Sequence, residues 1–160
     1  MRLRGTAVTL VEVVIVILLL SILAMVTVPR FTKATDKARE SALTTDLQAI
    51  RRQVELYKAQ HGGRGPHLDE KGKLDAKNIP ARLTGRSRPD GTLDPAGPRG
   101  PYLCEWPANP YSPDDVAREI RVGTDALPPR DGTTGWYYNT HTARVSANSR
   151  IGGESLDSIP

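Results

Sequence analysis

One apolar stretch near the beginning of the chain constrains its fold most. From Val8 to Val28 the sequence is a 21-residue run dominated by Val, Ile and Leu, and Pro29 closes it. A helix of this length spans about 32 Å, which matches a hydrocarbon core of about 30 Å. The run therefore predicts a transmembrane helix over residues 8–29. A cleavable secretory signal would have a shorter core ending in a small-x-small site, so we expect the helix to remain as an anchor.

The run contains a single acidic residue, Glu12. An ionised carboxylate inside a membrane helix costs on the order of 2–3 kcal/mol even on lenient insertion scales, so it needs a partner that neutralises it. Glu12 lies four residues after Val8, a plausible first residue after cleavage. We interpret the partner as a newly made amino terminus on a neighbouring copy of the chain.

These residues resemble a known family. Met1–Ala7 followed by VTLVEVVIVILLLSILAMVTVPRF is similar to the class III leader and amino-terminal helix of type IV pilins and type II secretion pseudopilins. In that alignment Thr9–Glu12 falls on the family's T-L-[IV]-E run, and Pro29 falls on its membrane-boundary proline. The resemblance implies cleavage between Ala7 and Val8, with Val8 becoming an N-methylated terminus.

The cleavage site departs from the family pattern. The family has Gly before the cut and Phe after it, where this chain has Ala7 and Val8. A cut between Gly5 and Thr6 is the second choice, but it would place Glu12 two residues too late. We therefore keep the register set by Glu12 and Pro29.

The segment after the apolar run predicts a continuation of the helix. Residues 31–60 contain no Gly or Pro, and apolar residues recur there at spacings of 4, 3, 4 and 3, which is one helical face. Gly62 and Gly63 predict the end of the helix. The face consists of Leu43, Leu47, Ile50, Val54 and Tyr57.

The remaining sequence predicts a small head of the α+β class. Residues 62–101 are rich in Gly, Pro and charge, with short helical or extended pieces near 74–83. Extended pieces are expected at 102–106, 119–122, 135–139 and 143–147, the last two forming a hairpin. Trp136 and Tyr138 would share one face and pack on the helical face that runs from Leu43 to Tyr57.

The resemblance implies a pilin-like fold: a long N-terminal helix, half transmembrane and half amphipathic, packed on a small C-terminal antiparallel sheet. The predicted segments are a leader at 1–7, a transmembrane helix at 8–29, its amphipathic continuation at 30–61, a variable loop region at 62–101, the antiparallel sheet at 102–149 and a flexible tail at 150–160.

Few residues point to catalysis, and we expect the protein not to be an enzyme. Nucleophile-elbow, zincin, P-loop and dinucleotide motifs do not occur, and His61, His67 and His141 lack ligand spacing. Cys104 is the only cysteine, which excludes an intrachain disulfide, and we expect it to be buried. The net charge of +4 comes from interspersed acids and bases, so nucleic acid is not an expected partner.

The resemblance also raises calcium as a possible cofactor. Major pseudopilins often hold a calcium ion in a loop of the sheet, and oxygen ligands would be required. The corresponding stretch carries Asp114, Asp115, Asp125 and Asp131, without a D-x-[DN]-x-[DN]-G pattern. These are weak candidates, and the competing interpretation is a set of solvated loop acids.

The resemblance implies a structural subunit of a type II secretion pseudopilus. Its partners would be further copies in a homopolymer, other pseudopilins, a prepilin peptidase, an inner-membrane platform protein, an assembly ATPase and membrane lipid. The turn YKAQHGGRGP and the loose match of WPANPY favour the major pseudopilin. A type IV pilus or DNA-uptake pilin is the nearest alternative, and a signal-anchored extracytoplasmic binding domain is a further one.

The membrane orientation has two readings. Arg2 and Arg4 precede the apolar run, and four bases between residues 30 and 39 follow it, so the positive-inside rule alone would put the C-terminal side in the cytoplasm. The family resemblance implies the reverse: a single-pass protein of the inner membrane with its head in the periplasm. We follow the resemblance.

Overall fold

The computed structural model describes residues 9–149, apart from the side chains of residues 26–32 within a helix. The predictions for the leader, for Val8 and for the tail at 150–160 lie outside the described residues. The chain divides into two compact units, Met1–Ala38 and Arg39–Pro160, each of which is described by itself.

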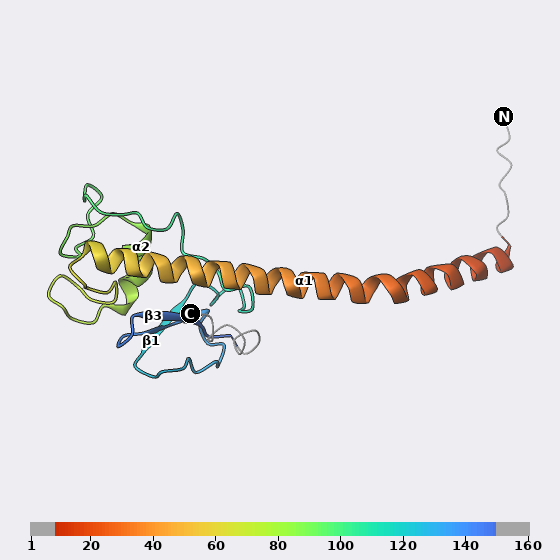
Figure 1. Ribbon diagram of the computed structural model, residues 1–160. Coiled ribbons are helices and arrows are strands. Elements are labelled where there is room, and N and C mark those ends of the chain that lie inside the picture. Colours follow the sequence, from red (N-terminus) through yellow and green to blue (C-terminus); the bar gives the residue numbers. More distant parts are fainter. Residues whose placement is uncertain (1–8, 150–160) are drawn as a thin grey trace, which may run out of the picture. The chain divides into compact units, whose positions relative to one another are not determined.

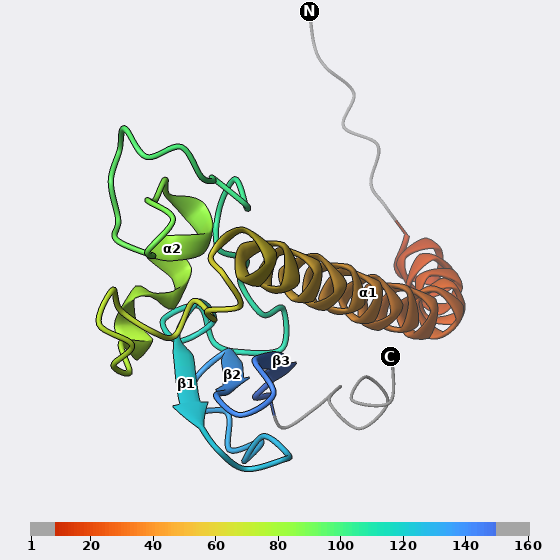
Figure 2. The same ribbon diagram turned by 60° about the vertical axis from the view of Figure 1, so that its left-hand side comes forward.

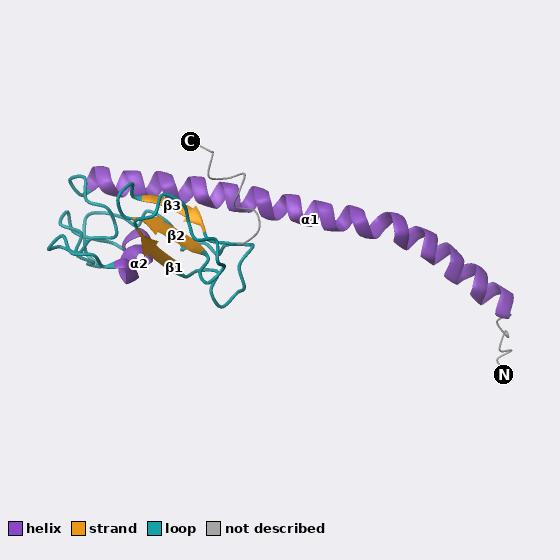
Figure 3. Ribbon diagram, turned by 90° about the horizontal axis from the view of Figure 1, so that it is seen from below, coloured by secondary structure: helices purple, strands orange, loops and turns teal. Residues whose placement is uncertain are grey.

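The described residues form an α+β protein, as the sequence predicts (Figure 1). Loops connect most of the short elements of the head (Figure 3). The elements in chain order are α1 (Leu10–Gln60), the 3-10 helix η1 (Ala76–Asn78), α2 (Ile79–Thr84), β1 (Ile120–Gly123), β2 (Trp136–Asn139) and β3 (Arg144–Ala147).

The end of α1 lies where the glycine pair predicts it. Gly62 and Gly63 have φ angles of 65° and 84°, a left-handed conformation that glycine adopts without a steric penalty. The N–H of Gly63 donates to the carbonyl oxygen of Lys58 at 2.8 Å. This bond satisfies one of the last carbonyl groups of the helix as the chain turns away.

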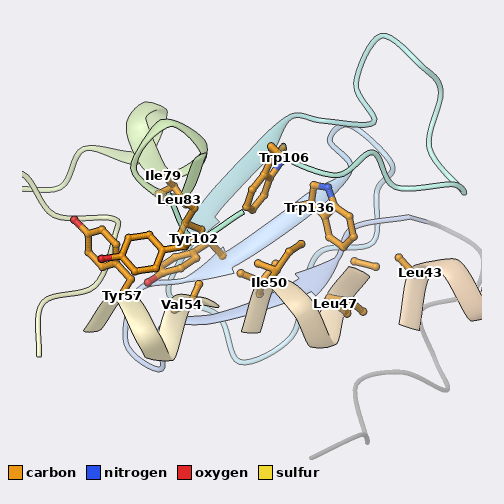
Figure 4. Packing of buried hydrophobic residues seen from close by; sticks show 13 residues of the cluster. Leu43, Leu47, Ile50, Val54, Tyr57, Ile79, Leu83, Tyr102, Trp106 and Trp136 are labelled. Atoms are coloured by element: carbon orange, nitrogen blue, oxygen red, sulfur yellow. The ribbon is translucent and has the colours of Figure 1, made fainter. Parts of the chain in front are cut away.

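The core of the head lies between one face of α1 and the sheet. The five side chains of this face, Leu43 to Tyr57, are 0–2% exposed, as their spacing predicts. Trp136 and Tyr138 of β2 are 0% exposed and belong to the same cluster, so the predicted packing of the aromatic strand on the helix is confirmed (Figure 4). Burying one large apolar side chain in this core stabilises the folded state by about 1.5–3 kcal/mol, compared with leaving it exposed to water.

The sheet has three strands in the order β1-β2-β3, and β3 lies nearest to α1 (Figure 2). The Nε–H of Arg51 donates to the carbonyl oxygen of Val145 at 3.0 Å, which links the helix directly to β3. The predicted hairpin is confirmed, because β2 and β3 pair antiparallel with Trp136 opposite Ala147. The observed strands begin within one residue of the predicted ones.

The prediction of a wholly antiparallel sheet is wrong. β1 and β2 are parallel, with Ile120 opposite Trp136 and Gly123 opposite Asn139. Parallel neighbours need a connection long enough to bring the chain back to the starting edge, and residues 124–135 provide it. Strand direction follows from this connection and not from the alternation within the strands.

The predicted extended piece at 102–106 does not join the sheet. Instead the N–H groups of Tyr102 and Leu103 both donate to the carbonyl oxygen of Leu83, each at 2.9 Å, which holds this segment against α2. A bend at residues 104–105 turns Cys104 outward, so the expectation that this thiol is buried is also wrong. Tyr102 and Trp106 take the buried positions on either side of it.

A buried guanidinium organises the loop region between α1 and the sheet. Arg82 of α2 has a side chain only 4% exposed, and its Nη2 lies 2.7 Å from Oδ2 of Asp75. Its other N–H groups donate to the carbonyl oxygens of Pro66 at 3.1 Å and Gly91 at 3.3 Å. The Asn78 amide, followed by Arg82, holds the pKa of the Asp75 carboxyl below its usual range. Arg82 thus connects three loops of this region.

We expect Arg82→Met to lower the free energy of unfolding by about 2–4 kcal/mol, because it removes the ion pair of Asp75, leaving this carboxylate only the Asn78 amide, and it leaves two loop carbonyls without their donor. The matched control is Arg88→Met: the Arg88–Asp94 pair has the same 2.7 Å separation, but the Arg88 side chain is 61% exposed. An exposed pair contributes far less to stability, because water screens the two charges. Urea denaturation of the full chain in detergent measures both losses, and equal losses would contradict the organising role of Arg82.

Candidate assembly site at the start of α1

The first turn of α1 is capped by a residue that precedes it. Oγ1 of Thr9 accepts a hydrogen bond from the N–H of Glu12 at 3.2 Å. The spacing T-x-x-E from Thr9 to Glu12 is that of a capping box, and an acid in the first turn also interacts favourably with the helix dipole. The sequence analysis missed this local role of Thr9, although the spacing contains the signal for it.

The described part of the apolar run is exposed on every side of the helix. Its large apolar side chains are between 45% and 80% exposed. Helices that are apolar all round are normally buried in protein or lipid. The side chains are Leu10, Val11, Val13, Val14, Ile15, Val16, Ile17, Leu18, Leu19, Leu20, Ile22, Leu23 and Met25.

Glu12 differs from its neighbours on this surface. Its side chain borders a shallow hollow of about 230 Å³ together with Val13, Val16 and Ile17. Within residues 9–149 its carboxylate receives no hydrogen bond, whereas the hydroxyl of Ser21 donates to the carbonyl oxygen of Ile17 at 2.7 Å. The acid is therefore the polar group of this surface that most requires a partner from another molecule.

Several predicted site residues lie wholly or partly outside the described part of the chain. Ala7 and Val8, like the second-choice pair Gly5 and Thr6, lie outside the described residues. Pro29 lies within α1, but its side chain is also outside the described part.

Across the part of the chain that the structure describes, no helical segment combines the length and the apolar character needed to cross a membrane.

The four candidate calcium ligands do not form one site. Asp114 and Asp115 are exposed in the turn before β1, and the Asp125 side chain is exposed after it. The carboxylate of Asp131 accepts hydrogen bonds within the protein, and the N–H and hydroxyl of Thr133 lower its pKa to about 2. Among residues 9–149, no three acidic, histidine or cysteine side chains form a group that could hold a metal ion.

His61 and Ser87 form a pair that the sequence did not reveal. Nε2 of His61 lies 3.0 Å from Oγ of Ser87, and its Nδ1 lies 2.8 Å from the carbonyl oxygen of Tyr57. A carbonyl oxygen only accepts, so Nδ1 carries the proton and Nε2 accepts from the serine hydroxyl. This geometry is that of a base beside a nucleophile. However, Ser87 is 0% exposed and His61 is 2% exposed, so the pair acts as a buried link between α1 and the loop region.

His67 forms a second buried link. It is 9% exposed, and its Nδ1 lies 2.9 Å from the hydroxyl oxygen of Tyr138. Burial, and then the nearby charges of Arg82 and Lys58, lower the pKa of His67 below its usual value. The folded protein therefore favours the neutral imidazole.

Comparison with protein-family models, with curated proteins and with solved structures finds no match for this chain. What the site can do therefore follows from its own residues: an exposed acid in the first turn of a helix whose other large side chains, as far as Met25, are apolar.

We expect acidification to destabilise the head through His67. Its pKa is lower in the folded state than the unfolded value of about 6.5, so the unfolded chain binds more protons in this range. The stabilisation is complete above about pH 6.5 and is lost as the pH falls below it. Tryptophan fluorescence during urea denaturation of the full chain at several pH values measures the slope of the free energy of unfolding against pH.

Two variants isolate the contribution of His67. His67→Gln keeps a group that can hydrogen-bond to Tyr138 but does not titrate, so its stability should depend less on pH between about pH 6.5 and 5. His141→Gln, which replaces an exposed histidine, is the matched control. An unaltered slope in His67→Gln would contradict the role of His67.

Proposed function

We propose that this protein is the structural subunit of a type II secretion pseudopilus. In this role it polymerises from the inner membrane and helps push exoproteins through an outer-membrane secretin. The exposed carboxylate of Glu12 on an otherwise apolar helical surface carries the proposal. The resemblance of residues 1–29 to pilin leaders and helices supports it.

The proposed assembly step pairs two charges from different copies. A prepilin peptidase removes Met1–Ala7 and leaves an N-methylated ammonium at Val8. The Glu12 carboxylate of one copy binds this ammonium on its neighbour, which cancels two charges in an apolar environment. Because the capping bond to Thr9 uses the Glu12 N–H and not its side chain, both carboxylate oxygens remain available.

The apolar surface supplies the attraction between copies, and the charge pair fixes their axial register. Side chains exposed on all sides of Leu10–Met25 can be covered together only by several helices or by lipid. We place the subunit in the inner membrane as a single-pass protein with its head in the periplasm. Its partners are other pseudopilins, a platform protein and an assembly ATPase, and its role is structural and not catalytic.

We expect Glu12→Gln to abolish assembly. It removes the partner of a buried ammonium, at a cost of about 2–3 kcal/mol per contact, or roughly 30- to 160-fold in the equilibrium constant. Electron microscopy of sheared filaments and an assay of secreted protein measure the loss. The matched control is Glu40→Gln, which removes another exposed acid of α1 and should assemble normally. Normal filaments in Glu12→Gln would exclude the pairing of Glu12 with the Val8 ammonium as the assembly mechanism.

We further expect the membrane form of the protein to begin at Val8 and to carry one added methyl group. Intact-mass and amino-terminal peptide mass spectrometry measure both features. A chain that begins at Thr6 would move the cleavage to the second-choice site. A chain that still begins at Met1, in cells that trim their other pilins, would contradict the proposal.

A further inference from the structure

A basic groove lies in the head between α1 and the β2–β3 turn. Its volume is about 500 Å³. Three arginines and one glutamate give its lining a net charge of +2, and the carboxylate of Glu55 is bound to Nζ of Lys58 at 2.9 Å. The lining consists of Arg51, Arg52, Glu55, Thr142, Ala143 and Arg144.

The walls of the groove are held in place by the fold. The bond from Arg51 to the carbonyl oxygen of Val145 fixes one wall at 3.0 Å. The N–H groups of His141 and Thr142 both donate to Oδ1 of Asn139 at 2.9 Å, which fixes the turn that forms the other wall. Arg52 and Arg144 are exposed at its rim, and Arg52 lies where it can reach an incoming anion.

An acidic turn lies just before β1. Asp114 and Asp115 are exposed neighbours within residues 113–118, and Glu119, which follows, is also exposed. The turn also contains the exposed Arg118, whose Nη2 lies 3.8 Å from Oε2 of Glu105, so its three acids and one base give it a net charge of −2. The turn is anchored at two points: the N–H of Asn109 donates to the carbonyl oxygen of Ala117 at 2.9 Å, and that of Gly135 donates to Val116 at 2.8 Å. A side chain at position 135 would collide with the carbonyl oxygen of Ala117, so this close approach requires glycine.

The basic groove and the acidic turn lie at opposite ends of the sheet. Ile120 begins β1 and pairs with Trp136 at the start of β2, so the acidic turn lies at that end. Asn139 ends β2 and leads into the turn that lines the groove, which therefore lies at the other end. The strands between them span four residues, or about 13 Å. This separation keeps the two surfaces of one molecule apart.

We propose that the acidic turn of one copy binds in the basic groove of the next. Guanidinium groups bind carboxylates through paired, charge-assisted hydrogen bonds, and the two adjacent acids match the positive charge of the groove lining. The contact joins two different surfaces and leaves one of each unoccupied at the ends, so it can repeat into an open chain. It rests on the proposed function in supplying the head-to-head contact of the filament.

Cross-linking between two full-length copies with different tags tests this contact. Both copies carry Cys104→Ser to remove the exposed native thiol. One copy also carries Arg52→Cys and the other Asp115→Cys. We expect oxidation to give dimers that contain both tags, and each cysteine variant alone to give few. Lys71→Cys with Asp115→Cys is the matched control pair, because Lys71 is an exposed base outside the groove.

A charge swap then identifies the occupant. Arg144→Glu on the Arg52→Cys copy should lower the dimer yield about tenfold, and Asp114→Lys on the other copy should restore it. Lys73→Glu makes the same charge change at another exposed site and should have little effect. A loss that Asp114→Lys does not restore would mean that another anion occupies the groove, and would overturn the proposal.

The outcomes also separate this contact from the proposed function. Filaments of chains trimmed to Val8 without the mixed dimer would overturn the head contact and leave the pseudopilus intact. Mixed dimers from chains that still begin at Met1 and form no filaments would support the contact and overturn the pseudopilus.

Discussion

The side chains from Leu43 to Tyr57 on one face of α1 are 0–2% exposed because the sheet and the loop region cover them, and the rest of the head depends on this contact. The chain has one cysteine, which is exposed, so no disulfide can hold the short strands together. The three strands have only four residues each, so their sheet depends on packing its apolar face against the helix. Trp136 and Tyr138 compensate, because two large aromatic side chains in one strand bury much apolar surface against the helix.

Beyond this contact, buried polar groups define the loops. Arg82, His61 and Asn109 are each at most 3% exposed, and each bonds to segments distant in sequence. Asn109 donates to the carbonyl oxygen of Gly135 at 2.7 Å and accepts from the N–H of Tyr111 at 2.9 Å. Such groups add little net stability when satisfied, but they are costly when a partner is lost. They therefore select one loop arrangement in a region with few apolar side chains, which explains how a polar stretch of this length adopts a defined structure.

The sequence predicted those parts of the fold that depend on local periodicity. The spacing of Leu43 to Tyr57, the stop at Gly62 and the hairpin each follow from neighbouring residues, and the structure confirms them. The direction of β1 depends on the twelve-residue connection at 124–135, and the links of His61 and Arg82 join residues far apart, so no local pattern contains them. At the candidate site the sequence indicated Glu12 through its charge within an apolar run and through its place in the T-L-V-E run. The capping bond of Thr9 was predictable from the T-x-x-E spacing. The basic groove was not, because it forms only where β3 packs against α1.

The two parts of α1 meet opposite physical requirements. From Leu43 to Tyr57 apolar residues occupy one face, which the head covers completely. From Leu10 to Met25 they occupy every face, and at 45–80% exposure the chain itself covers little of them. The hydrophobic effect has no direction along a helix, so apolar surfaces of this kind could associate in many registers. A single carboxylate changes this, because an ionised group in an apolar environment is tolerated only where its counter-charge lies within a few ångströms. In the proposed filament, Glu12 therefore selects one stagger among many that the apolar contacts alone would allow.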